Sequence, residues 1–176
     1  MRRRVISIMT AFMISLLLLA GCSSDSSVTG DEWLVKQEAC FEDLKAFADG
    51  MDSVYTLYFI ESITTEDFKT ELELLNKQYK ILVAFYEQMK EENPIKPESH
   101  SYLSKRGTEA MENIYDCLGE IIANSVDQNG KPLPPTQLAY SYLAYRQELI
   151  DYVTEFDTAV TLYKTNPDYY EIEKEN

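Results

Sequence analysis

Few side chains in this sequence have the chemistry of a catalytic group, and their spacing matches no familiar catalytic set. The chain contains a single histidine, His100. A Ser–His–Asp triad would have to centre on this residue, and the sequence contains no Gly-x-Ser-x-Gly nucleophile elbow. It also lacks the Glu-x-x-His pairs of ferritin-like di-iron bundles. We therefore expect His100 to be a solvated loop residue, and we predict no catalytic residue.

The two internal cysteines are predicted to be packing residues. Cys40 and Cys117 both fall on apolar stripes, where a thiol behaves as a small hydrophobic group. Without neighbouring histidines they do not indicate a metal site. In the antiparallel bundle that the helix pattern predicts, they lie at different heights, whereas a disulfide needs Cα atoms within about 7 Å. We predict two buried free thiols, no metal ion and no other cofactor.

One loop carries the residues that we select as a candidate contact surface. The sequence Asp-Gln-Asn-Gly that begins at Asp127 is partly similar to a calcium-binding loop, but Leu138 stands where that loop needs its bidentate glutamate. An ordinary turn is therefore predicted. Loops on rigid scaffolds often carry function, and exposed tyrosines are common in recognition surfaces. The predicted contact residues are Asp127, Asn129, Lys131 and Tyr140, the last of which does not fit the apolar stripes.

Heptad-like patterns in four segments between residues 31 and 166 predict four α-helices. Apolar residues that recur every seven positions form seams averaging about 3.5 residues per turn, which pack at about 20°. No strand pattern is visible. The main seam residues are Trp33, Cys40, Leu44, Phe47, Met51, Val54 and Tyr58; Phe68, Leu72, Leu75, Tyr79, Leu82, Tyr86 and Met89; Leu103, Gly107, Ala110, Ile114, Cys117 and Ile121; and Leu138, Tyr142, Tyr145, Leu149, Tyr152, Phe156, Ala159 and Tyr163.

Capping and helix-breaking residues separate the four segments. Thr64 can cap the second helix, and Ile63 can pack onto its first turn. The second helix should end at Asn93-Pro94, because a residue before proline avoids helical angles. The loop at 127–136 breaks the chain before the fourth helix, which should end at Asn166-Pro167.

The connections between these segments are short, which favours antiparallel neighbours. We predict an all-α domain over residues 31–166: an up-down-up-down antiparallel four-helix bundle with helices of about 28 residues and a packed interior without a cleft. The turn at 61–65 and the loop at 127–136 should share one end. A rival arrangement is two helical hairpins that complete their core only in a dimer. Residues 167–176 are predicted to be an acidic tail.

The first residues have the pattern of an export signal. Three arginines at positions 2–4 precede an apolar run from Val5 to Ala20, and small residues lead to Cys22. The sequence Leu19-Ala20-Gly21-Cys22 resembles the lipobox of bacterial lipoproteins. This resemblance covers about the first tenth of the chain and is specific.

The lipobox resemblance implies cleavage between Gly21 and Cys22 and a diacylglyceryl thioether on Cys22. Residues 1–21 would then be a lipoprotein signal peptide, and residues 22–30 a flexible tether that spans roughly 15 Å. Two acyl chains, commonly palmitate, are enough for durable anchoring. The expected location is the extracytoplasmic side of the cell membrane.

The charge of the chain argues against a nucleic-acid partner. The formal net charge is −14, and removal of the three N-terminal arginines changes it to −17. Such acidity opposes binding to nucleic acid and to anionic lipid surfaces. The partners left open are an envelope protein or an envelope polymer, in addition to the membrane that holds the lipid.

Together these patterns predict a membrane-anchored, non-enzymatic helical module that binds or scaffolds a ligand outside the cytoplasmic membrane. One alternative is an accessory subunit of a transporter or sensor, with helix-in-groove contacts. Another is an envelope-polymer hydrolase, which would need two carboxyl groups about 5–10 Å apart across a cleft. The sequence does not identify a ligand.

Overall fold

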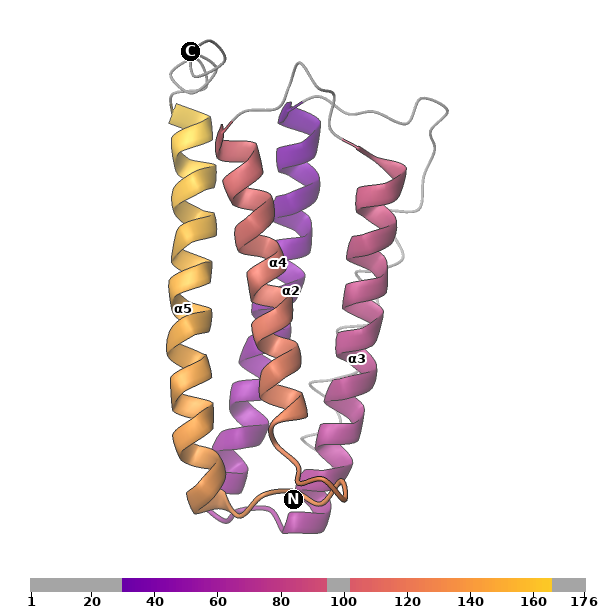
Figure 1. Cartoon of the computed structure of the whole chain (residues 1–176), viewed down its shortest axis with the longest axis vertical. Helices are drawn as coiled ribbons and strands as arrows, with labels where there is room; N and C mark the ends of the chain where they lie inside the picture. Colours follow the sequence, from indigo (N-terminus) through magenta and orange to yellow (C-terminus); the bar gives the residue numbers. More distant parts are fainter. Residues whose placement is uncertain (1–29, 95–101, 166–176) are drawn as a thin grey trace.

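The computed structural model describes residues 30–94 and 102–165, and within them it contains four helices and no strand. The helices are α2 (Gly30–Phe59), α3 (Thr65–Glu92), α4 (Tyr102–Ala123) and α5 (Pro135–Thr165), and they pack side by side (Figure 1). Helices account for 86% of the described residues, which confirms the predicted all-α bundle.

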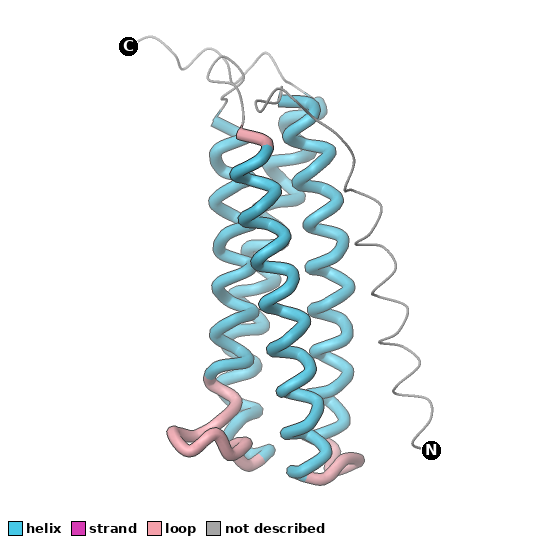
Figure 2. Tube along the Cα trace, turned by 90° about the vertical axis from the view of Figure 1, so that its right-hand side faces the viewer, coloured by secondary structure: helices cyan, strands magenta, loops and turns pink. Residues whose placement is uncertain are grey.

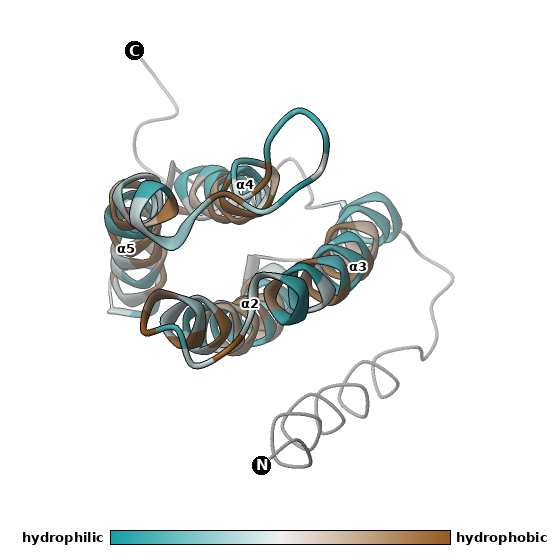
Figure 3. Cartoon of the chain, turned by 90° about the horizontal axis from the view of Figure 1, so that it is seen from below, coloured by the Kyte–Doolittle hydropathy of each residue, from teal (hydrophilic) through white to brown (hydrophobic). Residues whose placement is uncertain are grey.

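Consecutive helices run in opposite directions along the bundle. In Figure 1, α2 and α4 descend while α3 and α5 ascend. The side view places the α2–α3 turn and the α4–α5 loop together at the lower end (Figure 2). Viewed along the bundle, α2 and α4 lie between α3 and α5, and each of the two contacts the other three helices (Figure 3). The closest pair is α4 and α5.

The predicted apolar stripes meet in one continuous core. Aromatic rings join the helices near the lower end: Tyr58 stacks on Phe68 at a centroid distance of 3.9 Å, and Tyr55 stacks on Tyr142 at 4.4 Å. Such ring pairs stabilise a core beyond the area they bury. The largest fully buried side chains are Tyr55, Tyr86, Phe68, Phe156, Leu44, Met51, Leu75, Met111, Ile114, Leu118, Ile121 and Leu138.

Thr64 caps the start of α3, as the sequence predicts, and the structure adds a reciprocal bond that makes a capping box. The Thr64 hydroxyl accepts a hydrogen bond from the Asp67 N–H at 3.1 Å, and the Asp67 carboxylate accepts one from the Thr64 N–H at 3.3 Å. Ile63 packs, partly buried, against the core. The helix ends at Glu92, and the Asn93 N–H donates to the carbonyl of Met89 at 3.1 Å. Both predicted boundaries of the second helix are therefore confirmed.

The end of α2 is a Schellman motif with glutamate in the usual glycine position. The Ser62 N–H donates to the Leu57 carbonyl at 2.8 Å, and the Glu61 N–H donates to the Tyr58 carbonyl at 3.0 Å. Glu61 has a φ of 55°, in the left-handed region. Helices that end in this way satisfy their last carbonyl groups within the turn, but a side chain at this position introduces backbone strain.

The prediction of four helices of about equal length is wrong for α4, which has 22 residues against 28 to 31 in the others. This helix ends at Ala123 because the following residues turn inward: Ser125 is fully buried and bonds back to α2 and α4. The predicted signal peptide, Cys22, most of the tether, His100 and the predicted acidic tail lie outside the described residues.

Candidate functional site

The predicted contact loop forms a tight turn at the lower end of the bundle. The Asp127 Oδ1 accepts hydrogen bonds from the backbone N–H groups of Asn129 at 2.8 Å and Lys131 at 3.0 Å. Gly130 has a φ of 73°, which glycine adopts without strain. These backbone donors hold the pKa of the Asp127 carboxyl below its ordinary value. The carboxylate of Asp127 therefore stabilises the turn in which Asn129 and Lys131 lie.

Tyr140 lies apart from this turn, on the outer surface of α5. It is 84% exposed, and no hydrogen bond or ring contact joins it to residues 127–131 in the part of the chain that the structure describes. Leu143 and Ile150 on the same helix are 63% and 44% exposed. The structure therefore groups three of the four predicted contact residues and places Tyr140 in an exposed apolar row on α5.

Two tyrosines of α2 fix the α4–α5 loop to the bundle. The Tyr55 hydroxyl lies 2.6 Å from the Oγ of Ser125, which in turn donates to the Ile121 carbonyl at 2.6 Å. The Tyr58 hydroxyl donates to the Leu133 carbonyl at 2.9 Å. The loop is consequently held at both of its ends, and only the turn at 127–131 projects from the bundle.

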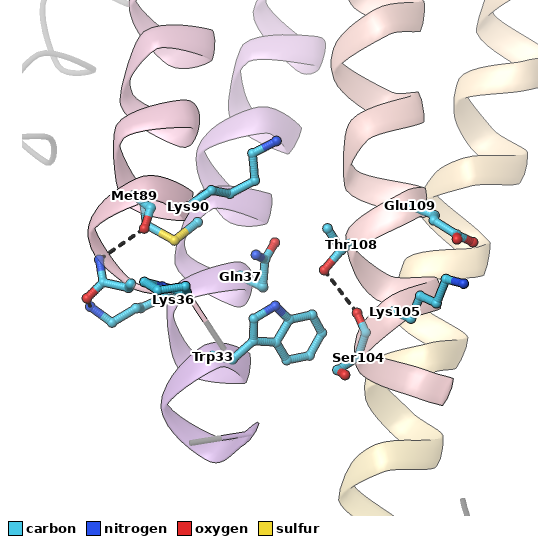
Figure 4. Close-up of a pocket in the computed structure, with 11 residues that line it drawn as sticks. Trp33, Lys36, Gln37, Met89, Lys90, Ser104, Lys105, Thr108 and Glu109 are labelled. Atoms are coloured by element: carbon cyan, nitrogen blue, oxygen red, sulfur yellow. Dashed lines mark hydrogen bonds between the residues drawn. The ribbon is translucent and has the colours of Figure 1, made fainter. Parts of the chain in front are cut away.

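At the opposite end, the bundle contains a cavity of about 600 Å³ between α2, α3 and α4. Its walls include Trp33 of α2, Met89 of α3 and Thr108 of α4, and we call it the Trp33 cavity (Figure 4). Trp33 and Gln37 point towards α4, and Thr108 points back towards them (Figure 4). The interior is packed as expected, but the expectation that the bundle has no cleft is wrong. The volume lies within the range of ligand sites.

The cavity has a buried polar group without a partner. Gln37 lines it and is only 1% exposed, and its Oε1 has no hydrogen-bond partner among the described residues. The hydroxyl of Tyr86 is also buried, and Gln37 is the polar side chain that interacts with it. Burial raises the pKa of Tyr86, and the nearby Gln37 amide partly opposes this effect. An unpaired buried polar atom is unfavourable by about 1–3 kcal/mol, and native proteins keep few of them.

Three lysines line the cavity, although the chain as a whole is strongly acidic. The Lys36 ammonium donates to the Asn93 Oδ1 at 2.9 Å, a neutral acceptor that leaves its charge uncompensated. Lys90 is balanced by Glu87 at 2.9 Å and Glu112 at 3.0 Å. Lys105 is exposed, and it forms no ion pair with another of the described residues. Figure 4 shows the Lys36 and Lys105 side chains directed to opposite sides of the cavity, with Lys105 pointing away from Trp33 on the same side of α4 as Glu109.

A second, smaller cleft of about 260 Å³ lies between α2 and α5. At its edge, the Arg146 guanidinium donates to both oxygens of Asp52 at 2.7–3.0 Å, and the Tyr142 hydroxyl donates to the same carboxylate. These charges compensate one another, and no unpartnered buried polar atom of the described residues lines the cleft. The Trp33 cavity is therefore the better candidate for a ligand site.

The cavity arises where the heptad stripes carry a polar or a small residue. Gln37 stands seven positions before Leu44, in the row that continues through Met51 and Tyr58. Gly107 lies on the facing stripe of α4, where a Cβ atom would come within 2.9 Å of the Trp33 ring. The Trp33 ring therefore fills the space that a side chain at position 107 would occupy. Gln37, a polar residue in an otherwise apolar row, is the sequence signal that could have indicated the cavity.

Few carboxylate and metal-ligating side chains of the described residues lie together. Glu109 is the one carboxylate among the residues that line the Trp33 cavity, and no group of three or more His, Cys, Asp or Glu side chains in the described ranges could hold a metal ion. Cys40 and Cys117 are buried and free, which confirms that prediction. Burial raises the pKa of the Cys40 thiol to about 12 and that of Cys117 to about 11.

Comparison with known proteins gives no match to a family model, to a curated protein or to a solved structure. Within residues 30–94 and 102–165, no helix combines the length and the apolar character needed to cross a membrane.

Proposed function

We propose that this protein is a lipid-anchored, extracytoplasmic binding protein without enzymatic activity, and that the Trp33 cavity is its ligand site. The observation that carries the proposal is the cavity itself: about 600 Å³ of space that opens to solvent between α2, α3 and α4, lined by the buried Gln37, whose Oε1 has no hydrogen-bond partner among the described residues. A ligand that hydrogen bonds to Gln37 would relieve this unfavourable burial. The lipobox sequence around Cys22 supports the anchor.

The position of the cavity agrees with a membrane-facing role. Helix α2 begins at Gly30, and Trp33 lies in its first turn, at the upper end of the bundle in Figure 1. An anchor on Cys22 precedes this end by eight residues, which span roughly 15 Å. The cavity would then lie close to the bilayer, while the turn at 127–131 would point away from it as the candidate contact surface for an envelope protein or polymer.

The anchor is tested by metabolic labelling with an alkyne fatty acid in a bacterial host. Wild type and a Cys117→Ser control should carry the label and sediment with membranes, because both retain Cys22. Cys22→Ser should lose the label and remain unprocessed. Label retained in Cys22→Ser would overturn the lipoprotein proposal.

Ligand binding in the cavity is tested by filling it. Thr108 and Thr70 are both helical threonines whose hydroxyls bond the carbonyl four residues earlier, but Thr108 lines the cavity and Thr70 is exposed on α3. We expect Thr108→Phe to abolish thermal stabilisation by compounds that stabilise wild type, and Thr70→Phe to retain it. Equal stabilisation of both variants would remove the cavity as the binding site.

A second candidate function is an accessory subunit of a membrane complex, and the exposed row on α5 favours it. Tyr140, Leu143 and Ile150 are large apolar side chains that face solvent on one helix, as expected of a helix that docks into a groove. Replacing Leu143 and Ile150 with glutamine should leave the cavity intact and abolish co-purification with a partner, if this candidate is right.

A further inference from the structure

Two of the lysines that line the Trp33 cavity do not form a site for a charged ligand. The Lys36 ammonium donates to the Asn93 Oδ1 at 2.9 Å, and Lys105 points away from Trp33 on the same side of α4 as Glu109 (Figure 4). The two lysines are directed to opposite sides of the cavity, so no single acidic group of a ligand could contact both of them.

The third lysine of the lining is already paired. The Lys90 ammonium lies 2.9 Å from a carboxylate oxygen of Glu87 and 3.0 Å from one of Glu112, and it lies 4.9 Å from the centroid of the Tyr86 ring. A charged group that enters the cavity next to Trp33 would therefore lose its hydration without gaining a free opposite charge there, which is unfavourable. This arrangement favours an uncharged ligand.

The walls of the cavity suit an apolar ligand body. Trp33 is 7% exposed, and its indole ring forms one wall, with the Met89 thioether from α3 nearby. The hydroxyl of Thr108, which also lines the cavity, donates to the Ser104 carbonyl of its own helix at 2.9 Å. Tryptophan offers a large flat surface, and methionine adapts to irregular shapes, so both pack well against chains and rings. We therefore expect the larger part of the ligand to be apolar.

Gln37 adds a polar contact to these apolar walls. It is 1% exposed, its Oε1 has no hydrogen-bond partner among the described residues, and its side chain points towards α4 (Figure 4). Burial raises the pKa of Tyr86, and Gln37 acts against this effect, which indicates that the amide N–H group lies towards the phenol oxygen. The Oε1 is then the amide atom that remains, and a carbonyl oxygen only accepts hydrogen bonds. The ligand should therefore carry a hydrogen-bond donor.

We propose that the Trp33 cavity binds an uncharged, largely apolar molecule with a hydroxyl group, which donates a hydrogen bond to the Gln37 Oε1 while the apolar body packs against Trp33 and Met89. The inference rests on the proposed function, because it assigns a ligand class to the same cavity. Such an alcohol can come from solution or from the bilayer next to the proposed anchor.

A pair of isomeric probes isolates the hydroxyl group. Decanol and methyl nonyl ether contain the same atoms, but only the alcohol can donate a hydrogen bond. The chain contains a single tryptophan, so tryptophan emission reports on this cavity, and the experiment uses the chain from Ser23 onward, which includes every described residue. We expect saturable changes in Trp33 emission with both probes, and about fivefold tighter binding of the alcohol. Decanoate and decylammonium should bind at least about tenfold more weakly than decanol.

Gln37→Leu and Tyr86→Phe are matched variants, because each removes one of two neighbouring buried polar groups. Gln37→Leu should fold, since leucine continues the apolar row of Leu44 and Met51, and it should bind the alcohol and the ether equally because the acceptor is lost. Tyr86→Phe retains the Gln37 Oε1 and should keep the preference for the alcohol. A preference that survives in Gln37→Leu, or that Tyr86→Phe also removes, would overturn the assignment of this acceptor.

The outcomes separate the ligand class from the site. Equal or tighter binding of the ether in the wild type, or binding of decanoate or decylammonium as tight as that of decanol, would overturn the ligand class and leave the cavity as a binding site. No change in Trp33 emission with any probe would also overturn the ligand class. Thermal stabilisation that Thr108→Phe does not abolish would remove the proposed site as well.

A last comparison identifies the source of the alcohol. The full lipidated chain on phosphatidylcholine vesicles that contain decanol is compared with the chain from Ser23 onward mixed with the same vesicles. Binding by the anchored chain at a lower decanol content indicates the bilayer as the source, and equal binding indicates solution.

Discussion

Burial in the bundle lowers the reactivity of two thiols, those of Cys40 and Cys117. Desolvation raises the pKa of Cys40, and the negative charge of Asp43 raises it further. Cys117 is similarly buried, and its Sγ donates to the Tyr145 carbonyl at 3.3 Å. The thiolate is the reactive form, so both groups should be inert in the native protein.

We expect Cys40 and Cys117 to react with a disulfide reagent at pH 8 at least about a hundredfold more slowly in the folded protein than in denaturant. The measurement is the release of the coloured thiol with time, using the chain from Ser23 onward. Rapid labelling of the native protein would contradict the structure, as would an intact mass lower by the two hydrogens of a disulfide.

Glu71 is a carboxylate in an unfavourable position. Burial raises its pKa, as does the nearby charge of Asp67, and its Oε2 has no hydrogen-bond partner among the described residues. The charged form is therefore disfavoured in the folded state. Above the raised pKa of the folded state, Glu71 is charged in both the folded and the unfolded protein, and its full destabilising effect is present. Below the unfolded-state pKa of about 4.3, the carboxyl group is protonated in both states and the effect disappears.

Glu71→Gln should accordingly raise the unfolding free energy at pH 7 by about 0.5 kcal/mol, a small value because solvent screens this partly exposed group. Urea titrations between pH 4 and pH 7 would measure it. The advantage of the variant should shrink as the pH falls through the raised pKa of Glu71. A difference that stays constant over this range would count against desolvation as the cause.

At the scale of elements, the turn between α2 and α3 is strained at one residue. Glu61 has a left-handed conformation within a Schellman motif, where glycine avoids the contact of Cβ with the backbone. Glu61→Gly should therefore raise the unfolding free energy by about 0.5–1 kcal/mol. Glu61→Ala is the control, since it removes the charge and retains Cβ. If Glu61→Ala raises the melting temperature as much as Glu61→Gly, the gain in stability comes from removing the carboxylate and not from relieving backbone strain.

Helix positions could be predicted from the sequence because their causes are local. Heptad spacing identified the buried faces, and Thr64 and Asn93 marked both ends of α3. The early end of α4 was not predictable in this way, since it depends on the contact of Ser125 with Tyr55 of a distant helix. The cavity was missed for a related reason. The heptad pattern identifies apolar positions, whereas a cavity depends on which residues from different helices meet, here Trp33 of α2, Met89 of α3 and Thr108 of α4.

At the scale of the molecule, the core is closed within one chain. Buried residues from all four helices form a single cluster, so the rival dimer of two hairpins is not needed to bury the stripes. We expect the midpoint of thermal unfolding to stay constant over a hundredfold range of about 1–100 µM protein, since only association makes it depend on concentration. A midpoint that rises with concentration would instead support the hairpin dimer.

Close packing where α2 begins has a practical consequence for handling the protein. A Cβ atom at Gly30 would collide with the hydroxyl of Tyr163, and Lys164 pairs with Glu38 at 2.6 Å, so the first turns of α2 and the last turn of α5 are packed together. A fusion partner joined directly to Gly30 or Thr165 would therefore lie at the same end of the bundle as the mouth of the cavity. An epitope inserted at Asn129 would project from the opposite pole and leave that mouth open for ligand screening.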